Sequence, residues 1–317
     1  MSKRRHHYIP EVLCKRFTKD LRNFYRLDFY EREAGAKWMS IKDAFVQKDL
    51  NTVNLAGIKD TEFIENFLDN QYESTYGKSI NKIFRILFEN ADDKIFEKQD
   101  CETILEFCAL SHLRTPSQLR QIHIQTLQRS YLFSIFAKPT DNLPVVDIDY
   151  ILTRTLFEGV NLIKKCLQGI TLRIAYHTFE DEYFLLADQP IALVNSNEKE
   201  FASPDLDIIL PVASNVVLIF SKTEKTGDIT HIQKRETIGN INKQLCSHFT
   251  RYIACANKEY LENFVANNNL VPYVLPKIAD IDSEKNRIID EIKKEIERNP
   301  HKRYIRINKK NGIEFIN

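Results

Sequence analysis

The stretch from Thr171 to Thr178 reads TLRIAYHT, and here the chain changes from the apolar spacing of helices to that of strands. Short runs rich in β-branched or aromatic residues follow it, separated by polar, turn-like segments. These runs cover residues 183–187, 191–194, 208–212 and 216–221. Together they predict an antiparallel sheet of short strands in the second half of the chain.

The residues before this stretch have the spacing of helices, with apolar side chains three or four positions apart. Helices are predicted over residues 61–76, 79–88, 103–113, 117–136 and 146–167. Asp100 stands where an N-cap is expected before the third of these helices, and Gly169 ends the last. Helices first and strands later predict an α+β fold.

The two ends of the chain add smaller elements. A short helix over residues 10–17 and a hairpin of residues 23–32 with 37–41 are predicted at the start. The pattern predicts helices over 237–249, 258–266 and 284–298, and a closing hairpin of 304–307 with 313–316. Without a repeat or a clear linker, we expect one α+β domain over residues 1–317. Its helical part covers about 60–168, its strand-rich part about 170–235, and its C-terminal helices and hairpin 237–317.

Composition excludes some classes of protein. The 45 basic and 44 acidic residues nearly cancel, so a site for a polyanion must be a local patch. Six cysteines without a C-x-x-C pair fit reduced thiols in a cytosolic setting. No apolar run approaches the roughly 20 residues of a membrane span. We therefore expect a cytoplasmic protein that does not contact membranes.

The least ordinary segment is the N-terminal run RRHHYIP, residues 4–10. Pro10 keeps the residue before it extended, and neighbouring side chains of an extended chain point to opposite sides. His6 and His7 are therefore expected to face different surroundings, one of them a site. Histidine suits proton transfer near neutral pH or metal binding. Arg5 and Tyr8 are candidates for substrate binding, and a solvated basic terminus is the alternative.

Two further segments carry candidate site residues. Arg114 lies where one predicted helix ends and the next begins, so it is placed to bind phosphate or carboxylate, or simply to cap the first helix. Gln118 follows as a candidate for substrate binding. Asp188 ends an apolar strand before Pro190, as a catalytic carboxylate or as a turn former. Asn242 is most simply the N-cap of a helix, and is a second candidate for substrate binding.

Acidic residues at a spacing of four form a stripe on one predicted helix: Glu65, Asp69 and Glu73. The stripe is either a solvated helix face or a source of a carboxylate for the site. A divalent metal ion is an open possibility, with Glu73 and Asp188 as its candidate ligands. The chain lacks a phosphate-binding glycine loop, a dinucleotide fingerprint, a His-Glu-x-x-His zinc motif and a nucleophile elbow.

The ordered set of motifs resembles the bacterial family called domain of unknown function 4238. The resemblance begins at the His-His-Tyr-Ile-Pro start and spans roughly residues 6 to 260. Its other motifs are Arg114-Thr115-Pro116, Ala187-Asp188-Gln189-Pro190, Leu210-Pro211-Val212-Ala213 and Ile241-Asn242. Ala187 and Ala213 stand where the family usually has serine, which weakens any proposal of a hydroxyl nucleophile. The resemblance implies that the histidine pair, Arg114 and Asp188 converge in one site.

These residue types are consistent with three functions. The first is a nuclease or ribonuclease-like effector in phage defence or a toxin system, acting on RNA or DNA alongside a protein partner. In it, His6 or His7 exchanges protons, Arg114 holds phosphate and Asp188 orients a histidine or binds a metal ion. The second is an enzyme that acts on a small nucleotide. The third is a non-catalytic binding or sensor module, in which the histidines only hold the N-terminus in the fold.

Overall fold

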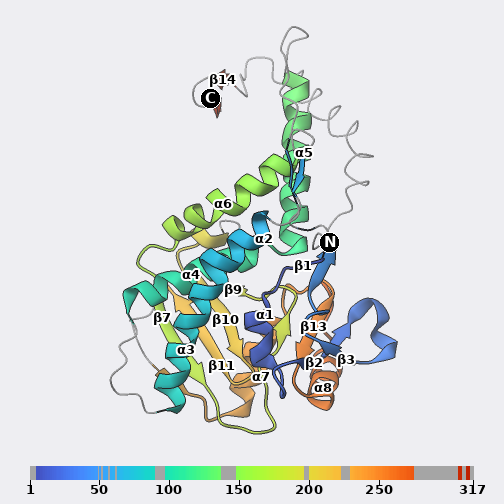
Figure 1. Cartoon of the computed structure of the whole chain (residues 1–317), viewed down its shortest axis with the longest axis vertical. Coiled ribbons are helices and arrows are strands. Elements are labelled where there is room, and N and C mark those ends of the chain that lie inside the picture. The colour runs from blue at the N-terminus through green and yellow to red at the C-terminus, as the bar shows by residue number, and fades with distance from the viewer. Residues whose placement is uncertain are drawn as a thin grey trace. The chain divides into compact units, whose positions relative to one another are not determined.

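The computed structural model describes residues 5–48, 50, 53–55, 58–60, 63–89, 97–136, 148–195, 200–222, 229–274, 306–308 and 312–314 (Figure 1). The chain divides into two compact units, residues 1–120 with 149–274 and residues 121–148 with 275–317. Helices and mainly antiparallel strands confirm the α+β fold. The first unit contains every candidate site residue. The expectation of a single domain stays a prediction.

The larger sheet of the first unit has the strand order β12-β7-β11-β10-β9. Its strands are β7 (Thr171–Tyr176), β9 (Ala192–Val194), β10 (Asp207–Ala213), β11 (Val216–Ser221) and β12 (Ile229–His231). All neighbours pair antiparallel except β12, which runs parallel to β7. Both edges of β11 are already paired, one with β10 and the other with β7. The next strand, β12, therefore pairs with the outer edge of β7, and the predicted antiparallel sheet is a mixed one.

The smaller sheet joins segments that are far apart in the sequence, in the order β3-β2-β13-β8. Its strands are β2 (Asn23–Asp28), β3 (Lys37–Ser40), β8 (Leu186–Ala187) and β13 (Tyr252–Cys255). The predicted N-terminal hairpin is confirmed as β2 and β3. Gly35 turns the chain with a φ of 68°, where an added Cβ would lie 2.8 Å from the Glu262 carboxylate. That carboxylate accepts a hydrogen bond from the Ala36 N–H at 2.9 Å.

The helices of the first unit include α3 and α4, which lie across the strands β7, β11 and β10 in Figure 1. The helices are α1 (Glu11–Cys14), α2 (Phe63–Leu68), α3 (Ser74–Phe88), α4 (Lys98–Leu113), α5 (Pro116–Phe136), α6 (Ile148–Cys166), α7 (Arg235–Leu245) and α8 (Lys258–Asn268). Most of α5 belongs to the second unit. Within the described part of the chain, no helix is both long and apolar enough to cross a membrane.

The short elements show which other predictions hold. The strands β4 (Val46–Lys48), β5 (Val53–Leu55) and β6 (Ile58–Asp60) were not predicted. In the second unit, β14 (Arg306–Asn308) and β15 (Gly312–Glu314) confirm the closing hairpin. The predicted helix over 284–298 lies outside the described residues. The two predicted helices over 61–76 and 79–88 form one helical run, in which a π-helical turn over Asp69–Glu73 joins α2 to α3.

Asp100 is not the N-cap that the sequence pattern predicts. Helix α4 begins two residues before Asp100, with Glu97 as its N-cap in a capping box. The Asp100 carboxylate accepts hydrogen bonds from the Glu97 N–H at 3.0 Å and from Ser79 and Lys82 on α3, both at 2.8 Å. Burial opposes its ionisation, but these hydrogen bonds outweigh burial and hold the pKa of Asp100 below its usual value.

The substitution Asp100→Asn tests this contact between α3 and α4. Because the folded state favours the carboxylate, Asp100 stabilises it at neutral pH, and that contribution is lost as the pH falls below about 4. At pH 7 we expect the variant to have a free energy of unfolding about 2 kcal/mol lower than the parent. Urea denaturation of both proteins from pH 7 to pH 3 should show that the difference in free energy of unfolding becomes smaller as the pH falls. A constant difference would contradict this role.

Candidate functional site

The N-terminal strand β1 (Arg5–His7) pairs antiparallel with β4, with His6 opposite Gln47. The His6 side chain is 1% exposed, whereas His7 is partly exposed. The alternation expected of an extended chain is thereby confirmed, with one histidine in the interior and the other at the surface. Pro10 is the N-cap of α1 and not its first helical residue.

Arg114 is completely buried at the C-terminal end of α4. Its Nη1 donates to Glu73 Oε1 at 2.8 Å, and its Nη2 donates to the backbone carbonyl of His7. Its Nε has no hydrogen-bond partner among the described residues. A buried cation needs such partners to offset its lost hydration. One guanidinium therefore joins the N-terminal strand, the π-helical turn and the corner between α4 and α5.

The residues next to Arg114 and Asp188 connect two of the predicted motifs. Thr115 Oγ1 and Gln189 Nε2 are 3.0 Å apart, and Gln189 also donates to the Ser117 hydroxyl. All three side chains are buried. The Arg-Thr-Pro corner and the Asp-Gln-Pro turn therefore meet in one polar network. Gln118 reaches this network through its backbone N–H, which lies 3.4 Å from Thr115 Oγ1.

The carboxylate of Asp188 is buried and accepts four hydrogen bonds. They come from the Thr250 N–H and hydroxyl, both at 2.8 Å, from the Arg251 N–H at 2.7 Å and from the Tyr252 N–H at 3.1 Å. Burial is the largest influence and raises the pKa of Asp188, against these hydrogen bonds, which lower it. Both oxygens are engaged with the start of β13. The structure therefore places Asp188 as a clamp between β8 and β13.

Two further candidates are also buried in structural contacts. Asn242 lies inside α7, which begins at Arg235, so the interpretation of Asn242 as an N-cap is wrong. Its side chain accepts from the Leu185 N–H at 3.0 Å and donates to the Tyr183 carbonyl at 2.8 Å. Tyr8 is 4% exposed and packs edge-on against Phe45, with ring centroids 5.9 Å apart. Neither residue faces an open site.

His7 faces a cleft of about 700 Å³ between the N-terminal segment and the helical run that includes α3. The lining residues are Arg5, His7, Glu11, Val12 and Lys15 on one side, and Asp69, Glu73, Ser74, Gly77, Lys78 and Asn81 on the other. The His7 side chain is 21% exposed, and its Nε2 lies 3.2 Å from the Ile41 carbonyl and 3.8 Å from Glu11 Oε1. A carbonyl can only accept, so it favours the tautomer with the proton on Nε2.

This arrangement leaves Nδ1 of His7 with a lone pair and without a hydrogen bond to any described residue. The Glu11 carboxylate lies beside the ring, near Nε2. Lys15 and Lys78 stand on opposite sides of the cleft, both exposed and neither in an ion pair with a described residue. Arg5 is paired with Asp43 at 2.9 Å. The cleft therefore combines a histidine and two exposed lysines with the carboxylates of Glu11, Asp69 and Glu73.

Sequence reasoning found His7, Arg5 and Glu73 but missed Glu11, Lys15 and Lys78. Glu11 follows His7 by four positions, but Pro10 and the start of α1 stand between them, so neither a strand nor a helix pattern pairs the two. Lys78 lies one helical turn after the π-helical turn. Such turns are frequent at functional sites, but no residue pattern in this segment marks one.

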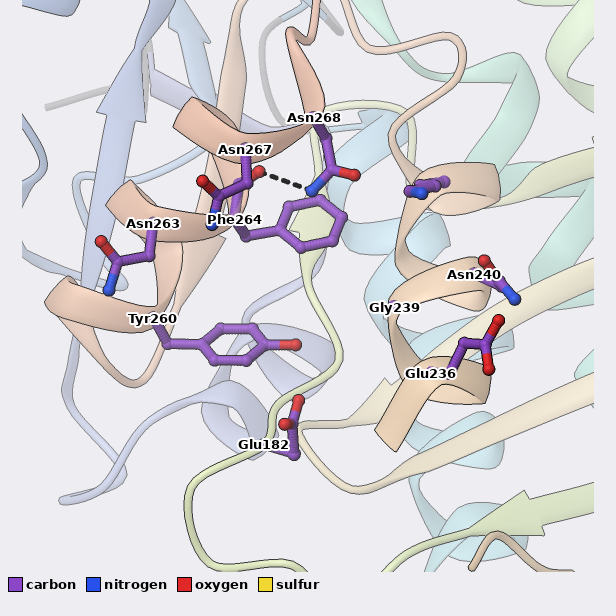
Figure 2. A pocket seen from close by; sticks show the side chains of 10 residues that line it. Glu182, Glu236, Gly239, Asn240, Tyr260, Asn263, Phe264, Asn267 and Asn268 are labelled. Carbon is purple, nitrogen blue, oxygen red and sulfur yellow. Dashed lines mark hydrogen bonds between the residues drawn. The ribbon is translucent and has the colours of Figure 1, made fainter. Parts of the chain in front are cut away.

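A second cavity, of about 340 Å³, lies between α7 and α8. Figure 2 shows the rings of Tyr260 and Phe264 pointing from α8 toward the side of α7 that carries Gly239. The Asn268 side chain donates to the Phe264 carbonyl at 2.7 Å and so holds the end of α8. No histidine lines this cavity. The cavity at His7, in contrast, is lined by a histidine.

The two predicted metal ligands do not fit a metal ion. Glu73 is paired with Arg114, and both oxygens of Asp188 are engaged by four donors. Across the parts of the chain that the structure describes, no three His, Cys, Asp or Glu side chains converge so as to hold a metal ion.

Comparison with known families agrees with the motifs at the start of the chain. Residues 5–138 match the model of a protein family of unknown function (DUF4238). This range contains β1, the cleft and Arg114, so the resemblance is confirmed for the part of the chain that forms the site. The motifs at Asp188 and Asn242 lie beyond the match. No curated protein and no solved structure matches the chain.

The ion pair between Arg114 and Glu73 can be tested by removing one partner. In the variant Glu73→Gln, the buried guanidinium keeps the His7 carbonyl but loses its counter-ion, so we expect the free energy of unfolding to fall by about 3 kcal/mol. The matched control is Glu89→Gln, because Glu89 pairs with Arg85 at the surface, where an ion pair contributes about 0–1 kcal/mol. If urea denaturation shows the same small loss of free energy of unfolding in both variants, the role of Glu73 is contradicted.

Proposed function

We propose that the protein is an enzyme that cleaves phosphodiester bonds in RNA or DNA within the cleft at His7. The observation that carries this proposal is the position of His7, which lines the cleft with Nε2 held by the Ile41 carbonyl and Glu11 beside the ring. Histidine in this setting is suited to general acid–base catalysis. Lys15 and Lys78 supply the positive charge that a phosphate needs.

In the proposed reaction, Nδ1 of His7 takes the proton from the attacking hydroxyl group or water. The ring becomes an imidazolium, which Glu11 stabilises at 3.8 Å. Lys15 and Lys78 hold the phosphate oxygens and stabilise the charge that grows on them during attack. The imidazolium then returns the proton to the leaving oxygen. His7 is the catalytic residue in this scheme, and the two lysines bind substrate.

The sequence predicts that Arg114 holds phosphate, but we assign it a structural role. It is buried behind the strand and does not line the cleft. Because its Nη2 binds the carbonyl of His7 itself, it is a positioning residue for the histidine. Asp188 holds the start of β13 through its hydrogen bond with the Tyr252 N–H. The Tyr252 ring in turn packs against Phe45, which packs against Tyr8.

The size of the cleft favours a second candidate, an enzyme that acts on a free nucleotide. A volume of about 700 Å³ lies within the range of small-ligand sites. The same residues would then act on a phosphate ester of a small molecule. Incubation of the full-length protein with total RNA, plasmid DNA and a panel of nucleotides separates the two candidates by which substrate is converted.

A matched pair of substitutions tests the role of His7. His7→Gln removes the proton-transfer group from a partly exposed position, so cleavage should fall at least 100-fold while the melting temperature stays within about 2 °C. His6→Gln changes the buried neighbour and should instead lower the melting temperature by several degrees. The measurements are cleavage of the active substrate and thermal unfolding of each variant.

Full cleavage by His7→Gln would contradict the proposal. If no nucleic acid or nucleotide in the panel is converted, the alternative of a non-catalytic binding or sensor module takes its place. We further propose that the cleavage activity serves phage defence or a toxin system, which predicts that expression of the parent protein slows bacterial growth. The variant His7→Gln should then be tolerated.

A further inference from the structure

A second feature of the first unit lies at the end of the smaller sheet where β2 leads into residues 29–34 and Arg251 precedes β13, and there arginine and tyrosine side chains stack in turn. The Arg251 guanidinium lies 4.9 Å from the centroid of the Tyr30 ring and 4.7 Å from that of Tyr252. The Arg26 guanidinium lies 4.0 Å from the Tyr252 ring. We call these four residues the arginine–tyrosine stack. Each contact is within the range of cation–π interactions.

The stack is open to solvent and held in place. Tyr30 is 73% exposed, and Arg26, Arg251 and Tyr252 are partly exposed. Asp28 accepts from Arg251 Nη2 at 2.6 Å and from the Tyr30 N–H at 3.0 Å, so one carboxylate positions both the cation and the outermost ring. Arg26 makes no ion pair with any described residue.

The charge around the stack favours a polyanion. Residues 5–48 contain ten Lys or Arg and six Asp or Glu, whereas the whole chain carries a net charge of only +1. The positive excess is therefore concentrated in the segment that supplies Arg26, Tyr30 and the N-terminal side of the cleft. A segment with such an excess is a favourable place for a polyanion to bind a chain of balanced composition.

The stack is also connected to the cleft through the core. The Phe45 ring packs against Tyr252, at a centroid distance of 6.4 Å, and against Tyr8, which directly follows His7. Phe45 thus lies between Tyr252 of the stack and Tyr8 of the N-terminal segment. A ligand that binds the stack would therefore contact rings that are packed, through Phe45, against the residue next to His7.

We propose that the arginine–tyrosine stack binds single-stranded nucleic acid, with Tyr30 stacking on an unpaired base and Arg26 contacting phosphate. Exposed rings beside cations are the recurring means of binding single strands, because every base offers a face for stacking. Bases in a duplex are already stacked on one another, so double-stranded DNA should bind more weakly. The proposal rests on the proposed function for its substrate class and names the form of nucleic acid that the site takes.

Fluorescence anisotropy of the full-length His7→Gln variant tests this proposal without cleavage of the probe. The probes are a labelled oligouridylate and an oligodeoxythymidylate of about twelve nucleotides, and a duplex of the same length. Adding Tyr30→Ala should weaken single-strand binding about five- to tenfold, whereas Tyr30→Phe should retain it. Arg26→Gln should lower the salt dependence, log Kd against log salt, by about 0.7. Phe88→Ala, an exposed aromatic change on α3, is the matched control and should bind normally.

Failure of the stack and failure of the proposed function give different results. If neither probe binds, or if Tyr30→Ala and Arg26→Gln bind as tightly as their parent, the stack proposal is overturned, whatever the parent protein cleaves. Equal binding of duplex and single strands, unaffected by Tyr30→Ala, also overturns it. If single strands bind through Tyr30 but the protein with His7 intact cleaves nothing, the stack proposal stands and the proposed reaction fails. The ratio of the two single-strand affinities identifies RNA or DNA as the preferred form.

Discussion

The guanidinium of Arg114 is fully buried, and its two hydrogen-bond partners come from segments 41 and 107 residues away in the sequence. Burying a cation is unfavourable unless its hydrogen bonds to water are replaced, so the positions of both partners are fixed together with that of the guanidinium. One of them is the backbone carbonyl of His7, on a strand only three residues long. So short a strand has few hydrogen bonds of its own, and its position depends on this contact.

Buried polar groups have the same task elsewhere in the first unit. Asp188 binds three successive N–H groups at the start of β13, Asn242 ties α7 to the segment before β8, and Gln189 connects the α4–α5 corner to the turn after β8. Satisfied polar networks of this kind rigidify a core. Arg114, Asp188 and Asn242, which look catalytic or substrate-binding in the sequence, make structural contacts, while the cleft is lined by His7 of β1 and by side chains of helical segments.

The secondary structure was predictable where it is local. The apolar spacing of α6 with Gly169 after it, the β2–β3 hairpin, and the strands β10 and β11 were all predicted close to their observed bounds, because each depends on neighbours in the chain. The pairing of β13 with β2 and β8 was not predictable, because it joins residues more than 60 positions apart. The same reason hid the cleft. His7 stood out by its type, but Lys78 became relevant only once α3 was packed against the N-terminal segment.

The π-helical turn over Asp69–Glu73 has a consequence for how related chains can vary in length. Such a turn accommodates one residue more than a regular α-helix would use over the same rise. Deleting a single residue from it would restore a regular helix, and because the extra residue is taken up within the turn, α2 and α3 would keep their places. Only the side chains of the turn itself would change direction, Glu73 among them, so the contact with Arg114 depends on the extra residue. Related chains with and without this residue should therefore share the packing of α2 and α3 and differ in the partner of the buried arginine.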